Sequence, residues 1–326
     1  MKNQVIGIDV SKDTLDYCTL KADTVDVVEK DVIHNEKTAI DEWLKSFDSS
    51  KVTFALEHTG HYGAALVKCL SENGFMFYLI NPLDLKRSLG IQRGKTDAKD
   101  AYRIAEYAIV NRHKLKFYQL PGEYLNRLKA LLAARERYVK ISVQIQNSLK
   151  ANEILNESID VKMLIQEEKK QHKSIKKSIK NIEVEMQKII QQNKGIKSTY
   201  QKITKVIGVG PVIAIKCIVE TENFTKFDNA RKFSCHCGLA PFPYQSGTSI
   251  KGKTKTHFLR DRSLKAILLK GAITAIQHDP QLKAYYNRKM NEGKHHMCVK
   301  NAVANKLALR IFAVAKRDEP FVKLVA

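Results

Sequence analysis

Four acidic residues occupy positions from which their carboxylates can act together. Asp9 ends a short segment rich in Val and Ile, and Glu57 ends a second apolar segment. Asp97 and Asp100 are three residues apart, so on a helix they share one face. Four converging carboxylates repel one another unless cations neutralise them, and Mg²⁺ or Mn²⁺ prefers such oxygen ligands. Because paired ions of this kind stabilise both oxygens exchanged in phosphoryl transfer, the four acids predict a metal-dependent nuclease-type site.

Each acid also has an ordinary structural explanation. Asp9 can cap a turn, Asp97 can cap a helix after Thr96, and Glu57 can be a surface residue. Taken singly, each of these explanations is adequate. The joint placement of all four at strand ends and one helix start favours the metal site.

The elements around the acids indicate an RNase H-like α/β domain. Three strands of an antiparallel meander are expected first, followed by alternating helices and strands, which is the order of that fold. The first and fourth strands are neighbours in such a sheet, so Asp9 and Glu57 are expected to meet. The strands expected are residues 4–10, 14–20, 26–33, 52–56 and 75–80, and the helices are residues 64–72 and 97–110.

A different pattern begins at Glu123. Apolar residues there recur at alternating steps of three and four, as in the contact seam of a coiled coil. Two long helices in an antiparallel hairpin are expected. We favour pairing of this hairpin with a second protomer over a spacer folded on its own protomer. The seams are Leu131, Ala134, Tyr138, Ile141 and Ile145 on the first helix, and Ile175, Ile179, Ile182, Met186 and Ile189 on the second.

A third unit begins at Tyr200, giving expected domains at residues 1–120, 121–199 and 200–326. The sequence IGVGP at residues 207–211 is typical of a helix-hairpin-helix turn. In such a turn Gly208 and Gly210 would let backbone amides approach a phosphate at a helix N-terminus. Residues 263–277 and 297–316 indicate further helices, so this unit is expected to be mainly helical.

The charge balance points to a polyanionic partner. The 326 residues include 56 Lys and Arg against 34 Asp and Glu, a net charge of +22. Residues 161–205 alone hold twelve Lys and four Glu, so they form either a solvated face or a phosphate-contacting one. No apolar run approaches the ~20 residues of a membrane span, and the N-terminus does not resemble a signal peptide. A cytoplasmic protein without membrane contact is expected.

The six cysteines are scattered, as buried thiols of a reduced protein are. Cys235 and Cys237 flank His236 and form a conceivable zinc half-site. The only candidate partners would be His295, His296 and Cys298. Structural zinc sites usually show CxxC-type spacing, so we favour ordinary packing.

Eight short segments give the chain a resemblance to the DEDD transposases of insertion sequences, the IS110-type family related to the Piv DNA invertase. The resemblance covers nearly the whole chain, and its two halves occur in the right order. The N-terminal segments are GIDVSK at 7–12, EHTG at 57–60, INP at 80–82 and KTDAKDA at 95–101. The C-terminal segments are IGVGP at 207–211, FTKF at 224–227, CGLAP at 237–241 and YQSG at 244–247.

This resemblance implies a RuvC-like N-terminal domain in which Asp9, Glu57, Asp97 and Asp100 bind Mg²⁺. It also implies that Ser246 is the nucleophile that joins to a DNA phosphate. Members of the family are guided by a structured noncoding (bridge) RNA that pairs with donor and target DNA. They act as homodimers that assemble into tetramers, and the carboxylates of one protomer can work with the serine of another.

The residues after Ser246 are strongly basic, with only Asp261 opposing. They would hold DNA beside the serine, or form a solvated loop. One departure from the family is that residues 256–262 contain no glycine where relatives often carry a Gly-rich basic stretch. The expected nucleic-acid contacts are Lys251, Lys253, Lys255, Arg260, Arg262 and the neighbouring Lys265.

Two other functions compete with an RNA-guided recombinase. A Holliday-junction nuclease, or a DNA invertase without guide RNA, would use the same carboxylates. A non-catalytic nucleic-acid-binding protein would use none of them. A tyrosine recombinase is disfavoured, because nothing resembles its Arg-His-Arg set around a C-terminal Tyr.

Overall fold

The computed structural model describes residues 3–58, 60–88, 90, 96–247, 250–317 and 319, and it describes no side chain at residues 250, 251 and 253. The chain divides into two compact units, Met1–Leu120 and Pro121–Ala326. The second unit includes both the long helical hairpin and the C-terminal helices, which the sequence suggested as separate domains.

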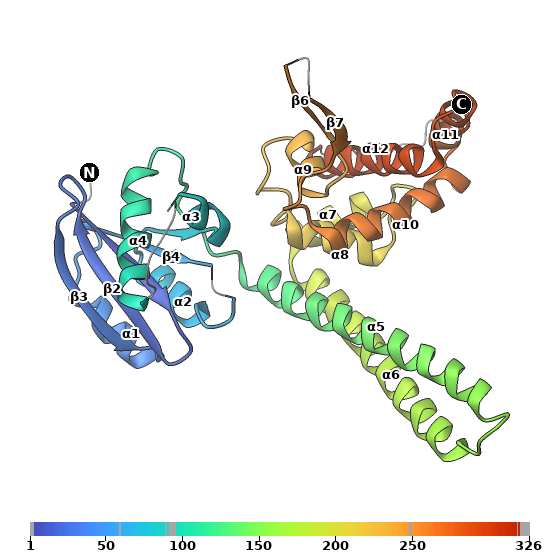
Figure 1. The fold of residues 1–326 in the computed structure, drawn as a ribbon, viewed down its shortest axis with the longest axis horizontal. Coiled ribbons are helices and arrows are strands. Elements are labelled where there is room, and N and C mark those ends of the chain that lie inside the picture. The colour runs from blue at the N-terminus through green and yellow to red at the C-terminus, as the bar shows by residue number, and fades with distance from the viewer. Residues whose placement is uncertain are drawn as a thin grey trace. The chain divides into compact units, whose positions relative to one another are not determined.

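A five-stranded sheet organises the first unit (Figure 1). Its strand order is β3-β2-β1-β4-β5, with the first three strands antiparallel and β1, β4 and β5 parallel. This is the RNase H-like order expected from the sequence. The strands are β1 Gln4–Val10, β2 Thr14–Lys21, β3 Val27–His34, β4 Val52–Glu57 and β5 Phe77–Ile80.

Helices cover both faces of this sheet. The helices are α1 Lys37–Leu44, α2 Ala64–Glu72, α3 Pro82–Ser88 and α4 Asp97–Val110. One core lies under α1 and α2 and contains Ile6, Ile8 and Phe54. The other lies under α3 and α4 and contains Val5 and Ala55. Because side chains alternate along a strand, the odd-numbered residues of β1 and β4 face α4.

The second unit is mainly helical, apart from one β-hairpin. The elements are α5 Glu123–Leu155, α6 Lys162–Gln192, α7 Lys194–Ile203, α8 Pro211–Glu220, α9 Ala230–His236, β6 Phe242–Ser246, β7 Ile250–Lys255, α10 Arg262–His278, α11 Pro280–Asn291 and α12 His296–Lys316. Figure 1 shows β6 and β7 projecting from the helices of this unit. The sequence did not predict this hairpin, α9 or α11.

Helices α5 and α6 form the expected antiparallel hairpin within one chain (Figure 1). The α6 seam lies as predicted, with Met186 and Ile189 fully buried. Helix α6 does not cover the middle of the predicted α5 seam, because Tyr138 and Ile141 are exposed. Ser142, one position after Ile141, faces α6 instead. Its hydroxyl lies 3.1 Å from Nε2 of His172 in α6.

Candidate functional site

Helix α4 crosses strand β1 at very short range, and Gly7 makes this possible. A Cβ atom on Gly7 would overlap the backbone of Ala101 and Ala105. Asp9 lies two positions after Gly7 on the same strand, so it faces the same side of the sheet. The side chain of Asp9 therefore lies on the face that α4 covers, and it is half-buried there.

Glu57 joins Asp9 on this face. Ile8 of β1 pairs with Leu56 of β4 in parallel register, so Asp9 and Glu57 occupy the next positions side by side. On its other side Glu57 pairs with Ile80 of β5, a residue of the core under α4. The sheet therefore brings together the two strand-end carboxylates that the sequence singled out.

The other two predicted acids lie in the first turn of α4. Thr96 is the N-cap, and its hydroxyl accepts a hydrogen bond of 3.4 Å from the backbone amide of Lys99. Asp97 follows as the first helical residue and is exposed. Asp100 is half-buried and pairs with Arg103, Nη1 to Oδ1 at 2.8 Å. Asp97 is therefore not the cap, and its carboxylate is available for another role.

A fifth carboxylate, which the sequence reasoning missed, faces the same place. Asp16 of β2 pairs directly with Asp9 of β1 in antiparallel register. Burial, and after it the negative charge of Asp97, raises the pKa of Asp16. Asp97 at the start of α4 is thus close enough to act on Asp16, which in turn lies opposite Asp9. The sequence signal that could have identified Asp16 is an acidic residue at an inward-facing position of the second strand.

This face of the first unit is strongly anionic. Acids from β1, β2, β4 and α4 face one region, and Arg103 pairs with one of them, Asp100. All the donors are carboxylate oxygens, the ligands that Mg²⁺ and Mn²⁺ prefer. The donor set therefore fits a hard divalent cation.

Ser246 lies at the end of the β6–β7 hairpin in the second unit. It is the last residue of β6, pairs with Ile250 and is exposed. Gly247 follows with a positive φ of 54°, so the chain turns immediately after the serine. Thr248 and Ser249, the neighbouring hydroxyl residues, lie outside the described residues. The serine hydroxyl is thus presented to solvent at the tip of a two-stranded ribbon.

Basic side chains gather at the base of this hairpin. Lys255 and Arg262 are exposed, whereas the side chains of Lys251 and Lys253 lie outside the described residues. Arg260 donates from Nη1 to the carbonyl oxygen of His257 at 3.1 Å. Burial, and after it the positive charge of Arg260, lowers the pKa of Lys265. A phosphate placed here would relieve the repulsion between these two cations.

The two glycines of the α7–α8 turn differ in their surroundings. Gly208 has a φ of 91°, and a Cβ on it would overlap the carbonyl oxygen of Gly271 in α10. Its lack of a side chain is therefore needed for packing. Gly210 is exposed at the N-cap of α8 with open space around it. A phosphate contact at this turn stays a prediction.

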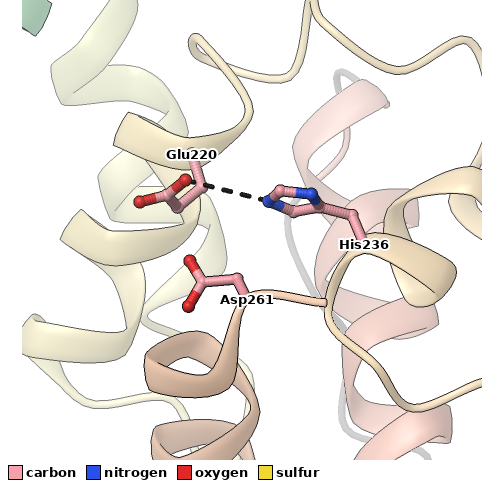
Figure 2. Close-up of side chains that lie close together, drawn as sticks. All are labelled: Glu220, His236 and Asp261. Carbon is pink, nitrogen blue, oxygen red and sulfur yellow. Dashed lines mark ion pairs between the residues drawn. The ribbon is translucent and has the colours of Figure 1, made fainter. Parts of the chain in front are cut away.

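A second group of charged residues was not predicted. The ligand-type atoms of Glu220, His236 and Asp261 lie within 4.8 Å of one another (Figure 2). The buried ammonium group of Lys216 lies 3.1 Å from Glu220 and 3.7 Å from Asp261. Lysine therefore already supplies a cation to these acids. Burial alone would raise the pKa of Glu220, but His236 and Lys216 outweigh it and hold that pKa at about 2.

The cysteines next to this group behave as packing residues. Cys237 is fully buried in the apolar core of the second unit, and burial raises the pKa of its thiol. Cys298 is exposed at the start of α12. Among the described residues no group of metal-ligating side chains includes a cysteine.

Two family models match the chain. A transposase family model for DEDD enzymes of the IS110 type matches residues 6–159, and a model for the transposase IS116/IS110/IS902 family matches residues 200–287. The pilin gene-inverting protein of Moraxella bovis is 24% identical over 334 residues, which cover 100% of this chain and 99% of that protein. An IS110 insertion-element protein of Streptomyces coelicolor is 32% identical over 121 residues, 36% of this chain and 29% of that protein.

Among solved structures, a T. thermophilus RuvC in complex with a Holliday junction substrate matches 35% of this chain and 99% of its own, with 16% identity and a TM-score of 0.28. No helix among the described residues is long and apolar enough to span a membrane.

Proposed function

Because the chain belongs to the IS116/IS110/IS902 family of transposases, we propose that it cuts and rejoins DNA by Mg²⁺-dependent transesterification with Ser246 as the nucleophile. The carboxylates and the serine lie in different compact units. In this reaction the first unit binds the metal and the second unit forms the covalent link to DNA.

One observation supports metal binding by the first unit. Asp9 and Glu57 stand side by side at the ends of β1 and β4, on the face where the first turn of α4 presents Asp97 and Asp100. These four residues would hold Mg²⁺, which supplies Lewis-acid stabilisation of the phosphate oxygens. The protein itself contributes a rigid support, because Gly7 fixes α4 against β1. Arg103 limits the repulsion at Asp100 until metal binds.

Covalent joining to DNA requires a serine that DNA can reach. In the proposed reaction the Ser246 oxygen forms a bond to phosphorus, and the bond from phosphorus to one sugar oxygen breaks. The serine gives up its proton, and the released sugar oxygen takes one up. A hydroxyl of a second strand then reverses the step, so the strands rejoin without ATP. The exposed place of Ser246 at the tip of the hairpin supports this role.

We propose donor DNA, target DNA and a structured guide RNA as partners. The net charge of +22 supports binding to nucleic acid. A homodimer that assembles into a tetramer is part of the same proposal. It is supported by the exposed apolar residues Tyr138, Ile141 and Val143 on α5, which the hairpin leaves uncovered.

DNA inversion without a guide RNA is a second candidate. This candidate is supported by sequence similarity to a pilin gene-inverting protein, which covers 100% of this chain and 99% of that protein. Sequencing the RNA that co-purifies with the full chain separates the two. A single structured RNA supports guidance, whereas wild-type recombination by nuclease-treated protein supports the inversion mechanism.

The central test combines one variant from each unit with labelled DNA. Asp100→Asn should abolish strand exchange while the protein stays folded, and EDTA should do the same to the wild type. Ser246→Ala should lose the covalent protein–DNA adduct on denaturing electrophoresis, and peptide mapping should place the wild-type adduct on residue 246. Recombination by Ser246→Ala would show that another nucleophile performs the joining step, whereas wild-type cleavage without an adduct or rejoined strands would show a hydrolytic nuclease.

A further inference from the structure

A group of charged residues, which we call the Lys216 cluster, lies at the base of the β6–β7 hairpin, which we call the serine hairpin. The cluster consists of Lys216, Glu136, Glu220, His236 and Asp261. His236 ends α9 before the hairpin, and Asp261 is the N-cap of α10 after it. The backbone amide of Asp261 donates to the carbonyl oxygen of His236 at 2.9 Å. The two ends of the segment that carries Ser246 are therefore joined at this cluster.

The serine hairpin has little else to hold it. All five residues of β6 are exposed, and within the described residues β6 and β7 pair only with each other. An isolated two-stranded hairpin is at best marginally stable in water. One further contact at its base is a 3.0 Å hydrogen bond from Asn301 of α12 to the carbonyl oxygen of Leu239. The orientation of Ser246 therefore depends on the base of the hairpin.

Lys216 connects this base to two other helices. Its ammonium group lies 3.1 Å from Glu136 of α5, 3.1 Å from Glu220 of its own helix α8 and 3.7 Å from Asp261. The side chain of Lys216 is only 9% exposed. Burial acts to lower the pKa of Lys216, but the three acids outweigh it and raise that pKa, so the group is charged.

Two more hydrogen bonds fix the acids in place. The hydroxyl of Ser263 in α10 donates to Glu136 at 2.9 Å, and the backbone amide of Leu264 donates to Asp261 at 2.8 Å. Removing a charged partner from such a buried network leaves the others unpaired, which is costly. The cluster therefore fixes α5, α8 and the start of α10 in one relative geometry.

We propose that Lys216 is a positioning residue for the serine reaction: its contacts with Glu136, Glu220 and Asp261 set the orientation of the serine hairpin, and hence the line of attack of Ser246. This inference rests on the proposed serine function. Attack on phosphorus requires the entering and leaving oxygens to be in line, and a misplacement of about 1 Å costs about 10²-fold in rate. Because Glu136 belongs to α5, the same contacts transmit the position of the α5–α6 hairpin to the serine.

The test measures single-turnover formation of the protein–DNA adduct by the full chain over a range of DNA concentrations. Lys216→Met should lower the maximal rate about tenfold or more, with the half-saturating DNA concentration unchanged within about twofold. Lys216→Arg should restore most of the rate, since it keeps the charge and the donors. Glu136→Ala, at a partly exposed position of α5, should lower the maximal rate in the same way but by less. This second variant keeps the test valid if Lys216→Met does not fold.

The matched control is Ile218→Val on the same helix, a fully buried residue outside the cluster. It should weaken the core without changing the adduct rate of the folded protein. Amide hydrogen exchange gives a second measurement that does not depend on the DNA reaction. The amides of Asp261 and Leu264 should exchange faster in Lys216→Met than in Ile218→Val.

The outcomes are distinguishable. If the wild type forms its adduct at Ser246 and Lys216→Met matches its maximal rate, the positioning role is wrong and the serine function stands. An equal loss in Lys216→Arg and Lys216→Met would also overturn the positioning role. If the wild type forms no adduct at residue 246, the serine function itself fails, and the positioning role fails with it.

Discussion

Asp9 and Asp16 face each other directly across β1 and β2, as a paired register position on the side of the sheet that α4 covers. Cross-strand neighbours have Cβ atoms about 4.5–5.5 Å apart, and like charges there destabilise the sheet. The register thus places two carboxyl groups side by side at the end of the central strand, and the negative charge of Asp97 also raises the pKa of Asp16. A divalent cation bound among these acids would stabilise their charged forms.

Asp16→Asn should therefore stabilise the metal-free protein and weaken its use of metal. Removing the Asp16 charge relieves its burial and its repulsion with Asp97, so the thermal midpoint in EDTA should rise. The Mg²⁺ concentration at half-maximal strand exchange should increase several-fold, because less negative charge attracts the ion. Asp13→Asn, at an exposed position in the same β1–β2 turn, is the control. A lower midpoint in EDTA together with an unchanged Mg²⁺ requirement would show that Asp16 is purely structural.

Gly7→Ala should damage both the stability and the activity of the first unit. The new Cβ would meet the backbone of Ala101 and Ala105, which cannot rotate away as a side chain can. Overpacking of this kind costs about 1–3 kcal/mol, measured as a lower urea midpoint. The displaced α4 should also separate Asp100 from Asp9 and reduce strand exchange. Gly122→Ala, where a Cβ meets nothing, should change the midpoint little; an equally stable Gly7→Ala would disprove the close approach.

Exposed lysines of α6 should contribute to nucleic-acid affinity through charge alone. Lys173, Lys176, Lys177 and Lys180 are exposed, and none takes part in an ion pair seen among the described residues. Each phosphate contact adds about 0.9 to the slope of log K against log salt on B-DNA. Replacing all four by Gln should lower that slope by about 0.9 for each lysine that contacts a phosphate.

The matched control for this series is Lys169→Gln with Lys170→Gln, on the same helix. Their side chains lie 3.4 Å from Glu153 and 2.7 Å from Glu167, so part of their charge is already compensated. These two substitutions should therefore lower the slope of log K against log salt by less per lysine than the fourfold variant does. Equal slopes in the wild type and the fourfold variant would mean that α6 is a solvated face.

Glu220 should make the stability of the second unit sensitive to acid. Its pKa is lowered from 4.5 to about 2, so the folded state binds its proton less tightly than the unfolded state does. The stabilising contribution is therefore complete above about pH 4.5 and is lost as the pH falls towards 2. It amounts to at most about 3 kcal/mol, and the interaction with Lys216 is already counted in it. Glu220→Gln should lower the urea midpoint at pH 7 and flatten its decline between pH 4.5 and 2; an unchanged decline would assign acid sensitivity to other groups.

The sequence alone determined the α/β order of the first unit and the strand-end places of Asp9 and Glu57. Alternation of apolar residues is a local property, so it can be recognised without knowing what packs against the strand. The close packing of α4 on Gly7 and the role of Asp16 were not accessible in this way. Both depend on the register between segments, which follows from the whole sheet.

The tertiary structure decided the features of the second unit that matter most for its chemistry. Helix α6 leaves the predicted α5 seam uncovered at Tyr138 and Ile141, because several faces of α5 carry apolar residues and only packing against α6 selects one. Lys216, Glu136 and Asp261 come from distant parts of the chain, and no local pattern marks them as partners. A buried charge is stable only where its counter-charges meet it, so the cluster at the base of the serine hairpin exists only once α5, α8 and α10 have packed together.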